Sequence, residues 1–207
     1  MEFRKALSGS SWEKVKNRQL LRFPLVHEWI EAAGIENGDT VLDIGPGPGV
    51  FTVHYAKVVG EQGKIIAIEK SEDAAAYLIA ELQNQSIHHV DVRIGDAEQR
   101  VHVDNDDIDV VMLTDVLHHA EHPFQILKNL RNITHAKPIK LFISEFDPEA
   151  EGRIGPPLVH RIHAETIQTW ATELNFGMLA HGKQYSEHYY MLLSIPAAQL
   201  REQAKDF

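Results

Sequence analysis

The chain lacks cysteine altogether among its 207 residues. Disulfide bonds, thiolate metal sites and a cysteine nucleophile are therefore excluded. It also lacks any apolar run near the roughly 18 residues that a transmembrane helix needs. The N-terminal segment MEFRKALSGSSWEKVKNRQ has no apolar stretch of the kind found in signal peptides. We therefore expect a soluble, cytoplasmic protein that does not act in a membrane.

Basic residues are in deficit. The chain has 20 Lys and Arg against 30 Asp and Glu, a formal net charge of −10, and its basic residues are scattered. Such a surface repels an extended phosphate backbone on average, so nucleic acid is not the expected substrate. Histidine, in contrast, is abundant with 13 copies, several of them closely spaced. Neutral imidazole can carry a proton or bind a metal, which makes these histidines candidates for chemistry.

Hydrophobic periodicity alternates along the chain between helical and strand-like. Helices are predicted over 24–33, 51–59, 72–84, 123–133 and 164–174, and strands over 41–44, 64–69, 90–94, 109–113, 139–144, 178–184 and 188–195. This alternation predicts a Rossmann-like three-layer α/β/α sandwich of about seven strands, mostly parallel, with an antiparallel C-terminal strand pair. We expect a single domain over 1–207, with a cap segment at 1–23, a core at 24–195 and a tail at 196–207.

A glycine-rich turn follows the first predicted core strand, in the stretch VLDIGPGPG. Gly45, Gly47 and Gly49 permit positive φ and close approach of a ligand, whereas Pro46 stiffens the turn and removes an amide donor. The dinucleotide pattern G-x-G-x-x-G/A requires Gly or Ala at position 50, where this chain has Val. The turn alone is compatible with a ligand platform or with a purely structural bend.

Acidic residues lie at or near the ends of three successive predicted strands. Asp43 precedes the turn, Glu69 closes the second strand, and Asp96 follows the third. In a doubly wound sheet these ends line one crevice, where carboxylates can accept hydrogen bonds from ribose hydroxyls or an exocyclic amine. Each acid alone could be a helix cap or a solvated loop residue.

The ordered motifs VLDIGPGPG, IAIEK, IGDAE and DVVMLTDVLHH resemble those of class I S-adenosylmethionine-dependent methyltransferases, over residues 24–195. The resemblance implies S-adenosylmethionine as cofactor and S-adenosylhomocysteine as product. Asp43 and the backbone of the glycine turn would surround the methionine portion. Glu69 would accept the ribose hydroxyls, and Asp96 the adenine amine. The resemblance also implies cofactor contacts for other residues: Gly45, Pro46, Gly47, Gly49, Lys70, Ala97 and Thr114.

Candidate catalytic residues cluster after the fourth and fifth strands. His118 and His119 follow TDVL within one helical turn, and Glu145 ends the fifth strand in SEF. A neutral histidine can remove a proton from a phenol, acid or amine at neutral pH. Alternatively, one histidine packs under its helix and the other caps it. Positioning of the two substrates can also suffice for methyl transfer, so a catalytic residue is not required.

Residues near the expected acceptor side are Asp115, at the end of the fourth strand, and His160 and Arg161 in GPPLVHRI. Arg161 could clamp an acidic acceptor, or form a salt bridge within the protein. A metal site built from Glu145 and nearby histidines is conceivable, but no ligand spacing demands one, and none is predicted.

Segments 1–23 and 145–163 should roof the acceptor pocket, with Phe3, Trp12 and Phe23 as covering aromatics. Because no large substrate-binding insertion exists, we expect a small-molecule methyl acceptor, methylated at O, N or C, or else a partner that supplies part of the site. A homodimer is compatible with the sequence. TDVLHH stands where amino methyltransferases of adenine or glutamine carry an Asn/Asp-Pro-Pro-Tyr/Phe motif. Two alternatives remain: an NAD-dependent oxidoreductase, disfavoured by Val50, and a non-catalytic S-adenosylmethionine-binding regulatory subunit.

Overall fold

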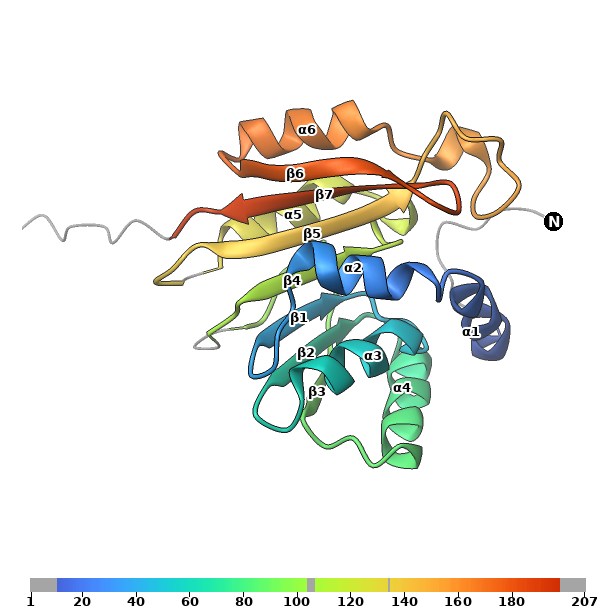
Figure 1. The fold of residues 1–207 in the computed structure, drawn as a ribbon, viewed down its shortest axis with the longest axis vertical. Coiled ribbons are helices and arrows are strands. Elements are labelled where there is room, and N and C mark those ends of the chain that lie inside the picture. The colour runs from blue at the N-terminus through green and yellow to red at the C-terminus, as the bar shows by residue number, and fades with distance from the viewer. Residues whose placement is uncertain (1–10, 104–106, 134, 198–207) are drawn as a thin grey trace, which may run out of the picture.

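The computed structural model describes residues 11–103, 107–133 and 135–197 (Figure 1). In chain order its helices and strands are α1 (Trp12–Leu21), α2 (Leu25–Ala33), β1 (Thr40–Ile44), α3 (Val50–Val59), β2 (Lys64–Glu69), α4 (Glu72–Asn84), β3 (Val90–Ile94), β4 (Val110–Thr114), the 3-10 turn η1 (Leu117–His119), α5 (Pro123–Arg131), β5 (Ile139–Phe146), the 3-10 turn η2 (Leu158–His160), α6 (Ala164–Glu173), β6 (Gly177–Gln184) and β7 (His188–Ile195).

The strands form one seven-stranded sheet in the order β3-β2-β1-β4-β5-β7-β6. Strands β1 to β5 are mutually parallel, whereas β7 runs antiparallel to both β5 and β6. The strand order reverses between β1 and β4, because the chain first adds strands on one side of β1 and then crosses to the other. This topology confirms the predicted fold class and places the switch point beside the glycine turn.

Two hydrophobic cores lie on opposite faces of the sheet. Alternate residues of β1 show the division: Val41 packs with α2, α3 and α4, while Leu42 packs with α5 and α6. Figure 1 shows α2 and α3 in front of the sheet and α5 behind it. Burial of both faces explains why a central strand such as β4 (VVMLT) is almost continuously apolar, whereas the edge strand β3 (VDVRI) is not.

Helix α1 was not among the predicted elements, since its apolar residues are few. Only Val15 and Gln19 are buried on it. Long-range contacts hold it instead: the Tyr77 hydroxyl donates to Glu13 at 2.7 Å, and Lys16 Nζ lies 3.1 Å from Glu81 Oε2. These contacts attach α1 to α4 at the end of the molecule towards which the parallel strands point (Figure 1).

Smaller differences concern boundaries. Strand β5 continues two residues beyond the prediction, through Glu145 and Phe146, because it pairs with β7 along its full length. In the described part of 95–109 no helix forms between β3 and β4. Phe3 and most of the predicted tail lie outside the described residues. None of the described helices is both long enough and apolar enough to span a bilayer.

Candidate active site at the strand ends

The glycine turn adopts the conformation that its sequence requires. Gly45, Gly47 and Gly49 have φ of 68°, 58° and 83°, a region that residues with a Cβ rarely adopt. A Cβ built on Gly47 would lie 3.5 Å from Gln19 Nε2, so protein atoms do not block it. Gly47 is therefore required by backbone conformation, whereas a Cβ on Gly49 would also lie 2.2 Å from Leu78 Cδ1.

Asp43 is buried beneath this turn, where Thr52 on α3 donates a hydrogen bond of 2.7 Å to its Oδ2. Burial raises the pKa of Asp43 to about 7; the Thr52 bond opposes the rise and the neighbouring Glu69 adds to it. A carboxyl group that exchanges its proton near neutral pH is sensitive to any charge that enters the site.

Glu69 ends β2 with each carboxylate oxygen on a backbone amide. Gly47 N–H donates to Oε2 at 2.9 Å, and Ser71 N–H donates to Oε1 at 2.9 Å. Burial raises the pKa of Glu69, and the amides of Ser71 and Gly47 oppose the rise, as do the charge and the backbone amide of Lys70. Each oxygen retains a lone pair, so the carboxylate can still accept two further hydrogen bonds, the number that a ribose diol offers.

The remaining predicted cofactor residues lie along the same strand edge. Asp96 follows β3, where its Oδ1 accepts the Glu98 N–H at 2.9 Å. Ala97 is buried, and its carbonyl accepts a hydrogen bond from Asn129. Lys70 is half exposed, with Nζ 3.9 Å from Glu98. Thr114 is buried at the end of β4.

Helix α1 covers the glycine turn, a feature that the sequence did not reveal. The Gln19 side chain donates from Nε2 to the Pro46 carbonyl at 3.1 Å and accepts the Val50 N–H at Oε1, 3.2 Å away. Trp12 lies close to the same turn, 4.0 Å from the position of a Gly47 Cβ. Phe23, expected as a covering aromatic, packs against His54 instead. Helix α1 is thus attached to the glycine turn by the two hydrogen bonds of the Gln19 side chain.

A histidine and a glutamate form a buried pair beside the turn. His118 Nδ1 lies 2.6 Å from Glu145 Oε2, and Leu117 N–H donates to Glu145 Oε1 at 2.6 Å. Because the carboxylate accepts at both oxygens, Nδ1 is the ring nitrogen that carries the proton. His118 Nε2 has no hydrogen-bond partner among the described residues. The His119 ring lies against that of His118, with centroids 4.1 Å apart.

Asp115 forms a second charged cluster next to this pair. Its Oδ1 accepts a hydrogen bond from His188 Nε2 at 2.9 Å, and its Oδ2 lies 2.5 Å from Arg22 Nε. Burial alone would raise the pKa of Asp115, but the charges of Arg22 and His188 outweigh it and hold that pKa well below its ordinary value. The residue also has φ of 59°, which the surrounding contacts must stabilise.

Arg161, predicted near the acceptor, is buried and braces the loop after β5. Its guanidinium donates to the carbonyls of Pro156, Asp147 and Ile154, and Nη1 also lies 2.8 Å from Glu187. These contacts use four of the five N–H donors of the guanidinium and favour the salt-bridge alternative over the acceptor clamp. The neighbouring His160 is half-buried at the end of η2.

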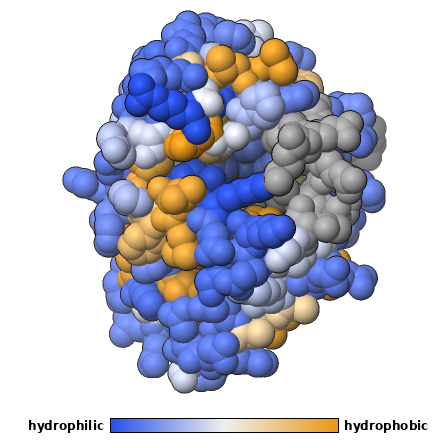
Figure 2. All heavy atoms as spheres, turned by 90° about the vertical axis from the view of Figure 1, so that its right-hand side faces the viewer, coloured by the Kyte–Doolittle hydropathy of each residue, from blue (hydrophilic) through white to orange (hydrophobic). Residues whose placement is uncertain are grey.

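Figure 2 views the molecule from the end at which the parallel strands finish. A hydrophilic hollow lies near the centre of this face, with hydrophobic side chains beside it. Exposed aliphatic residues belong to both segments that were expected to form the roof: Leu20 and Leu21 on α1, and Leu158 and Val159 in η2. The strand-end face therefore combines a polar interior with apolar side chains from the roof segments.

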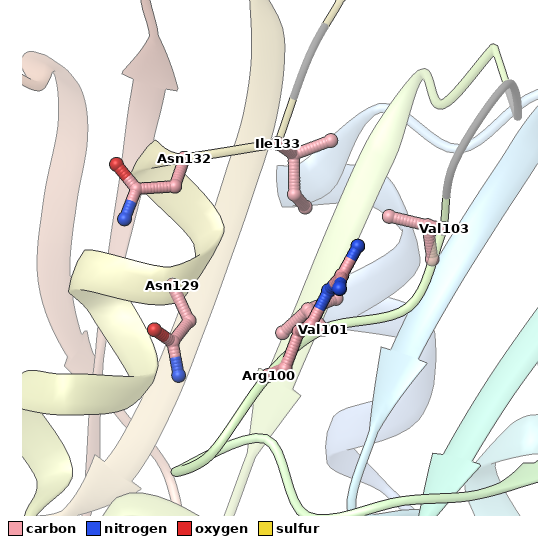
Figure 3. A pocket seen from close by; sticks show the side chains of 6 residues that line it. All are labelled: Arg100, Val101, Val103, Asn129, Asn132 and Ile133. Atoms are coloured by element: carbon pink, nitrogen blue, oxygen red, sulfur yellow. The ribbon is translucent and has the colours of Figure 1, made fainter.

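A separate cavity of about 240 Å³ lies away from these residues, between α5 and the segment that follows β3 (Figure 3). Six residues line it: Arg100, Val101, Val103, Asn129, Asn132 and Ile133. None of them belongs to the predicted site. Within the described ranges, no three side chains of His, Asp or Glu gather in a way that could hold a metal ion.

Known proteins resemble this chain in sequence and in fold. Residues 35–195 match the family described as methyltransferase domain. A probable cobalt-precorrin-6B C(15)-methyltransferase (decarboxylating) of Sulfurisphaera tokodaii is 33% identical over 85 residues, which is 41% of this chain and 44% of that protein. The ribosomal RNA small subunit methyltransferase A of Desulforapulum autotrophicum is 38% identical over 63 residues, 30% of this chain and 21% of that protein. The chain thus matches less than half the length of either relative.

The fold comparison covers more of the chain. A SAM-dependent methyltransferase from Aquifex aeolicus superposes with a TM-score of 0.81 at 20% identity, over 89% of this chain and 98% of that one. The predicted cofactor, S-adenosylmethionine, is confirmed by these matches, and the oxidoreductase alternative is not supported. Given the family match, the sheet order and the glycine turn, the chain belongs to the class I S-adenosylmethionine-dependent methyltransferases.

Proposed function

We propose that this protein transfers a methyl group from S-adenosylmethionine to a small-molecule acceptor whose proton is removed by His118. The observation that carries the proposal is the buried pair of His118 and Glu145, placed at the strand ends beside the glycine turn. A carboxylate that fixes the tautomer of a histidine is a recurrent arrangement in general-base catalysis.

The residues at the strand ends fit this cofactor. Glu69 keeps two lone pairs for the ribose hydroxyls, and the positive-φ glycines leave the turn bare where the methionine portion would approach. Asp43 would adjoin the same portion, while Asp96 and Ala97 would receive the adenine. When bound, S-adenosylmethionine supplies an electrophilic methyl group, so the protein need only hold the acceptor in line and manage its proton.

His118 is suited to that second task. Its Nδ1–H is held by Glu145, so Nε2 presents a lone pair that can accept the proton from an acceptor hydroxyl or amine. The positive charge that forms on the ring is then stabilised by the buried carboxylate 2.6 Å away. The proton passes from the acceptor to Nε2 and afterwards to solvent, which regenerates the base.

Two features support a small acceptor. Among the described residues, the expected roof segments contribute only one short helix, α1, and the loop that contains η2. The formal net charge of −10 disfavours a nucleic acid, although one relative is named as a ribosomal RNA methyltransferase. The competing function is a cofactor-binding subunit without turnover, because the residues that would bind the cofactor can be intact in a protein that has lost its acceptor site.

The test has two stages. Calorimetric titration with S-adenosylmethionine, S-adenosylhomocysteine and NAD in parallel should give micromolar binding of the two sulfur ligands only. Purified protein is then incubated with methyl-labelled cofactor and with separate pools of small phenols, carboxylic acids and amines, alongside ribosomal RNA and a denatured protein mixture. Label in a small-molecule pool supports the proposal; label only in RNA or protein, or binding without transfer, refutes it.

A further inference from the structure

Arg22 lies at the junction between the cap helix and the core. It is the C-cap residue that follows α1, and its carbonyl accepts a hydrogen bond of 2.9 Å from the N–H of Leu25, the first residue of α2. Gln19, nearly one turn earlier on the same helix, is clamped to the glycine turn. The position of the Arg22 backbone is therefore determined on both sides, and its side chain reaches the end of β4.

The guanidinium of Arg22 is held from one side only. Nε lies 2.5 Å from Asp115 Oδ2, and Cζ lies 5.5 Å from the centroid of the Phe146 ring. The Asp115 contact is an ion pair without hydrogen-bond geometry, since neither Nε nor Oδ2 has a hydrogen-bond partner among the described residues. The side chain is only 13% exposed, so most of its stem is packed and its orientation is restricted.

The hydrogen bonds of Glu145, Asp115 and Arg22 show which of their polar atoms lack a partner. Both oxygens of Glu145 accept hydrogen bonds, and Asp115 Oδ1 accepts one from His188. Asp115 Oδ2 has only the ion-pair contact with Arg22 Nε. The two terminal nitrogens of Arg22, in contrast, make no hydrogen bond within the part of the chain that the structure describes. Each carboxylate oxygen therefore has a hydrogen-bond or ion-pair contact, whereas the terminal N–H groups of Arg22 have none there, and a partner for these donors must be an acceptor.

The chemistry of a guanidinium specifies this acceptor. Two parallel N–H groups in a fixed plane match the two oxygens of a carboxylate, and a partly desolvated site strengthens such a charge-assisted pair. Arg161, the other arginine on the Phe146 ring, is different, because backbone carbonyls and Glu187 already occupy it. Only Arg22 of these two can bind a ligand without rearrangement.

We propose that Arg22 binds a carboxylate group in the active site, with Asp115 as the positioning residue that holds its guanidinium in place. The inference rests on the proposed function in one respect, that the strand ends are where the ligands bind. Two sources offer the same chemistry: the amino-acid end of the cofactor, and a carboxylate on the methyl acceptor. Arg22 would select for the charge of that group in either case.

Three variants test the proposal. Arg22→Gln removes both the positive charge and the two parallel N–H groups. Arg22→Lys keeps the charge beside Asp115 but removes the parallel N–H groups. Arg18→Gln is the matched control, because Arg18 is exposed on the same helix, α1. Thermal unfolding of each variant shows whether the fold is retained.

The first measurement compares two nucleoside ligands by calorimetry. S-adenosylhomocysteine carries the amino-acid carboxylate, whereas 5′-methylthioadenosine lacks it. If the cofactor is the source, Arg22→Gln should weaken S-adenosylhomocysteine roughly 10- to 100-fold and leave 5′-methylthioadenosine unchanged. The second measurement titrates benzoate and benzamide into protein saturated with S-adenosylhomocysteine. If the acceptor is the source, wild type should prefer benzoate, and Arg22→Gln should lose that preference.

Either selective loss supports the proposal and identifies the source of the carboxylate. Unchanged affinities in both measurements, or equal losses in the Arg18→Gln control, overturn it. If Arg22→Gln does not fold, Arg22→Lys replaces it in both measurements. A folded lysine variant that binds S-adenosylhomocysteine and benzoate with wild-type affinity also overturns the proposal. No step requires methyl transfer, so a failure of the proposed reaction would leave this result intact and would be recognised separately.

Discussion

Replacing Glu145 by glutamine should separate proton removal from positioning. The Glu145 side chain is fully buried, and its two oxygens accept from Leu117 N–H and from His118 Nδ1, both at 2.6 Å. Glutamine offers one acceptor oxygen and one donor NH₂ group. In one orientation the NH₂ faces the Leu117 amide; in the other it faces Nδ1 and forces the His118 proton onto Nε2. The first leaves two donors opposed, and the second removes the proposed base.

The magnitude follows from these two orientations. An unsatisfied buried donor costs about 1–3 kcal/mol of folding stability. A wrong tautomer or the loss of a general base should lower kcat by roughly 100- to 10,000-fold. Affinity for S-adenosylhomocysteine should not change, because the hydrogen bonds of Glu145 go to residues outside the glycine turn.

The assay measures kcat, KM and S-adenosylhomocysteine affinity for wild type and Glu145→Gln, with Glu149→Gln as control. Glu149 is an exposed acid four residues later, so its amide variant should behave as wild type. If Glu145→Gln binds S-adenosylhomocysteine normally and turns over at the wild-type rate, methyl transfer depends on positioning alone, and the role proposed for His118 is wrong.

Three further predictions concern the cofactor side. The pKa of Asp43 is about 7 in the folded protein against 3.8 ordinarily. The folded state therefore holds a proton that the unfolded chain has lost, and this group reduces stability as pH rises from about 4 to 7. Asp43→Asn lacks this titration, so in denaturant unfolding its stability relative to wild type should rise by about 2 kcal/mol between pH 5 and pH 7; parallel pH curves would contradict this. Gln19→Leu leaves the Pro46 carbonyl and Val50 amide without their partner, and should lower the free energy of unfolding by about 1–3 kcal/mol, checked in the same experiment. Gly47→Val places a β-branched residue at φ of 58° and should abolish S-adenosylhomocysteine binding while circular dichroism shows a retained fold; retained affinity would remove the turn from the cofactor site.

The helices and strands predicted from hydrophobic periodicity agree with the structure where buried residues recur at regular intervals along the element. Strands β1, β2 and β4 are mostly apolar because helices cover both faces of the sheet, and the sequence shows that pattern directly. Helix α1 has no such pattern, since polar contacts to α4 and to the glycine turn attach it to the core. The spacing of its hydrophobic residues cannot distinguish such a polar helix from a solvent-exposed N-terminal segment without regular structure.

The site shows the same division. The motifs predicted positions for Asp43, Glu69 and Glu145 near the ends of strands, and for His118 just after one, and the structure has them in β1, β2, β5 and η1. They did not indicate that Arg161 would be enclosed by loop carbonyls, because hydrogen bonds to carbonyl groups leave no trace in residue type. His188 was also missed; its contact with Asp115 bridges 73 positions.

By itself, therefore, the sequence determined the layered sheet, the glycine turn and the carboxylates at the strand ends, because these depend on local periodicity and on backbone conformations that few residues adopt. Only the tertiary structure decided how α1 closes over the turn, which arginine is enclosed and which retains open donors. Those outcomes depend on hydrogen bonds and ion pairs between distant segments, such as Gln19 with Pro46 and Arg22 with Asp115, whose geometry exists only after the sheet has brought the strand ends together.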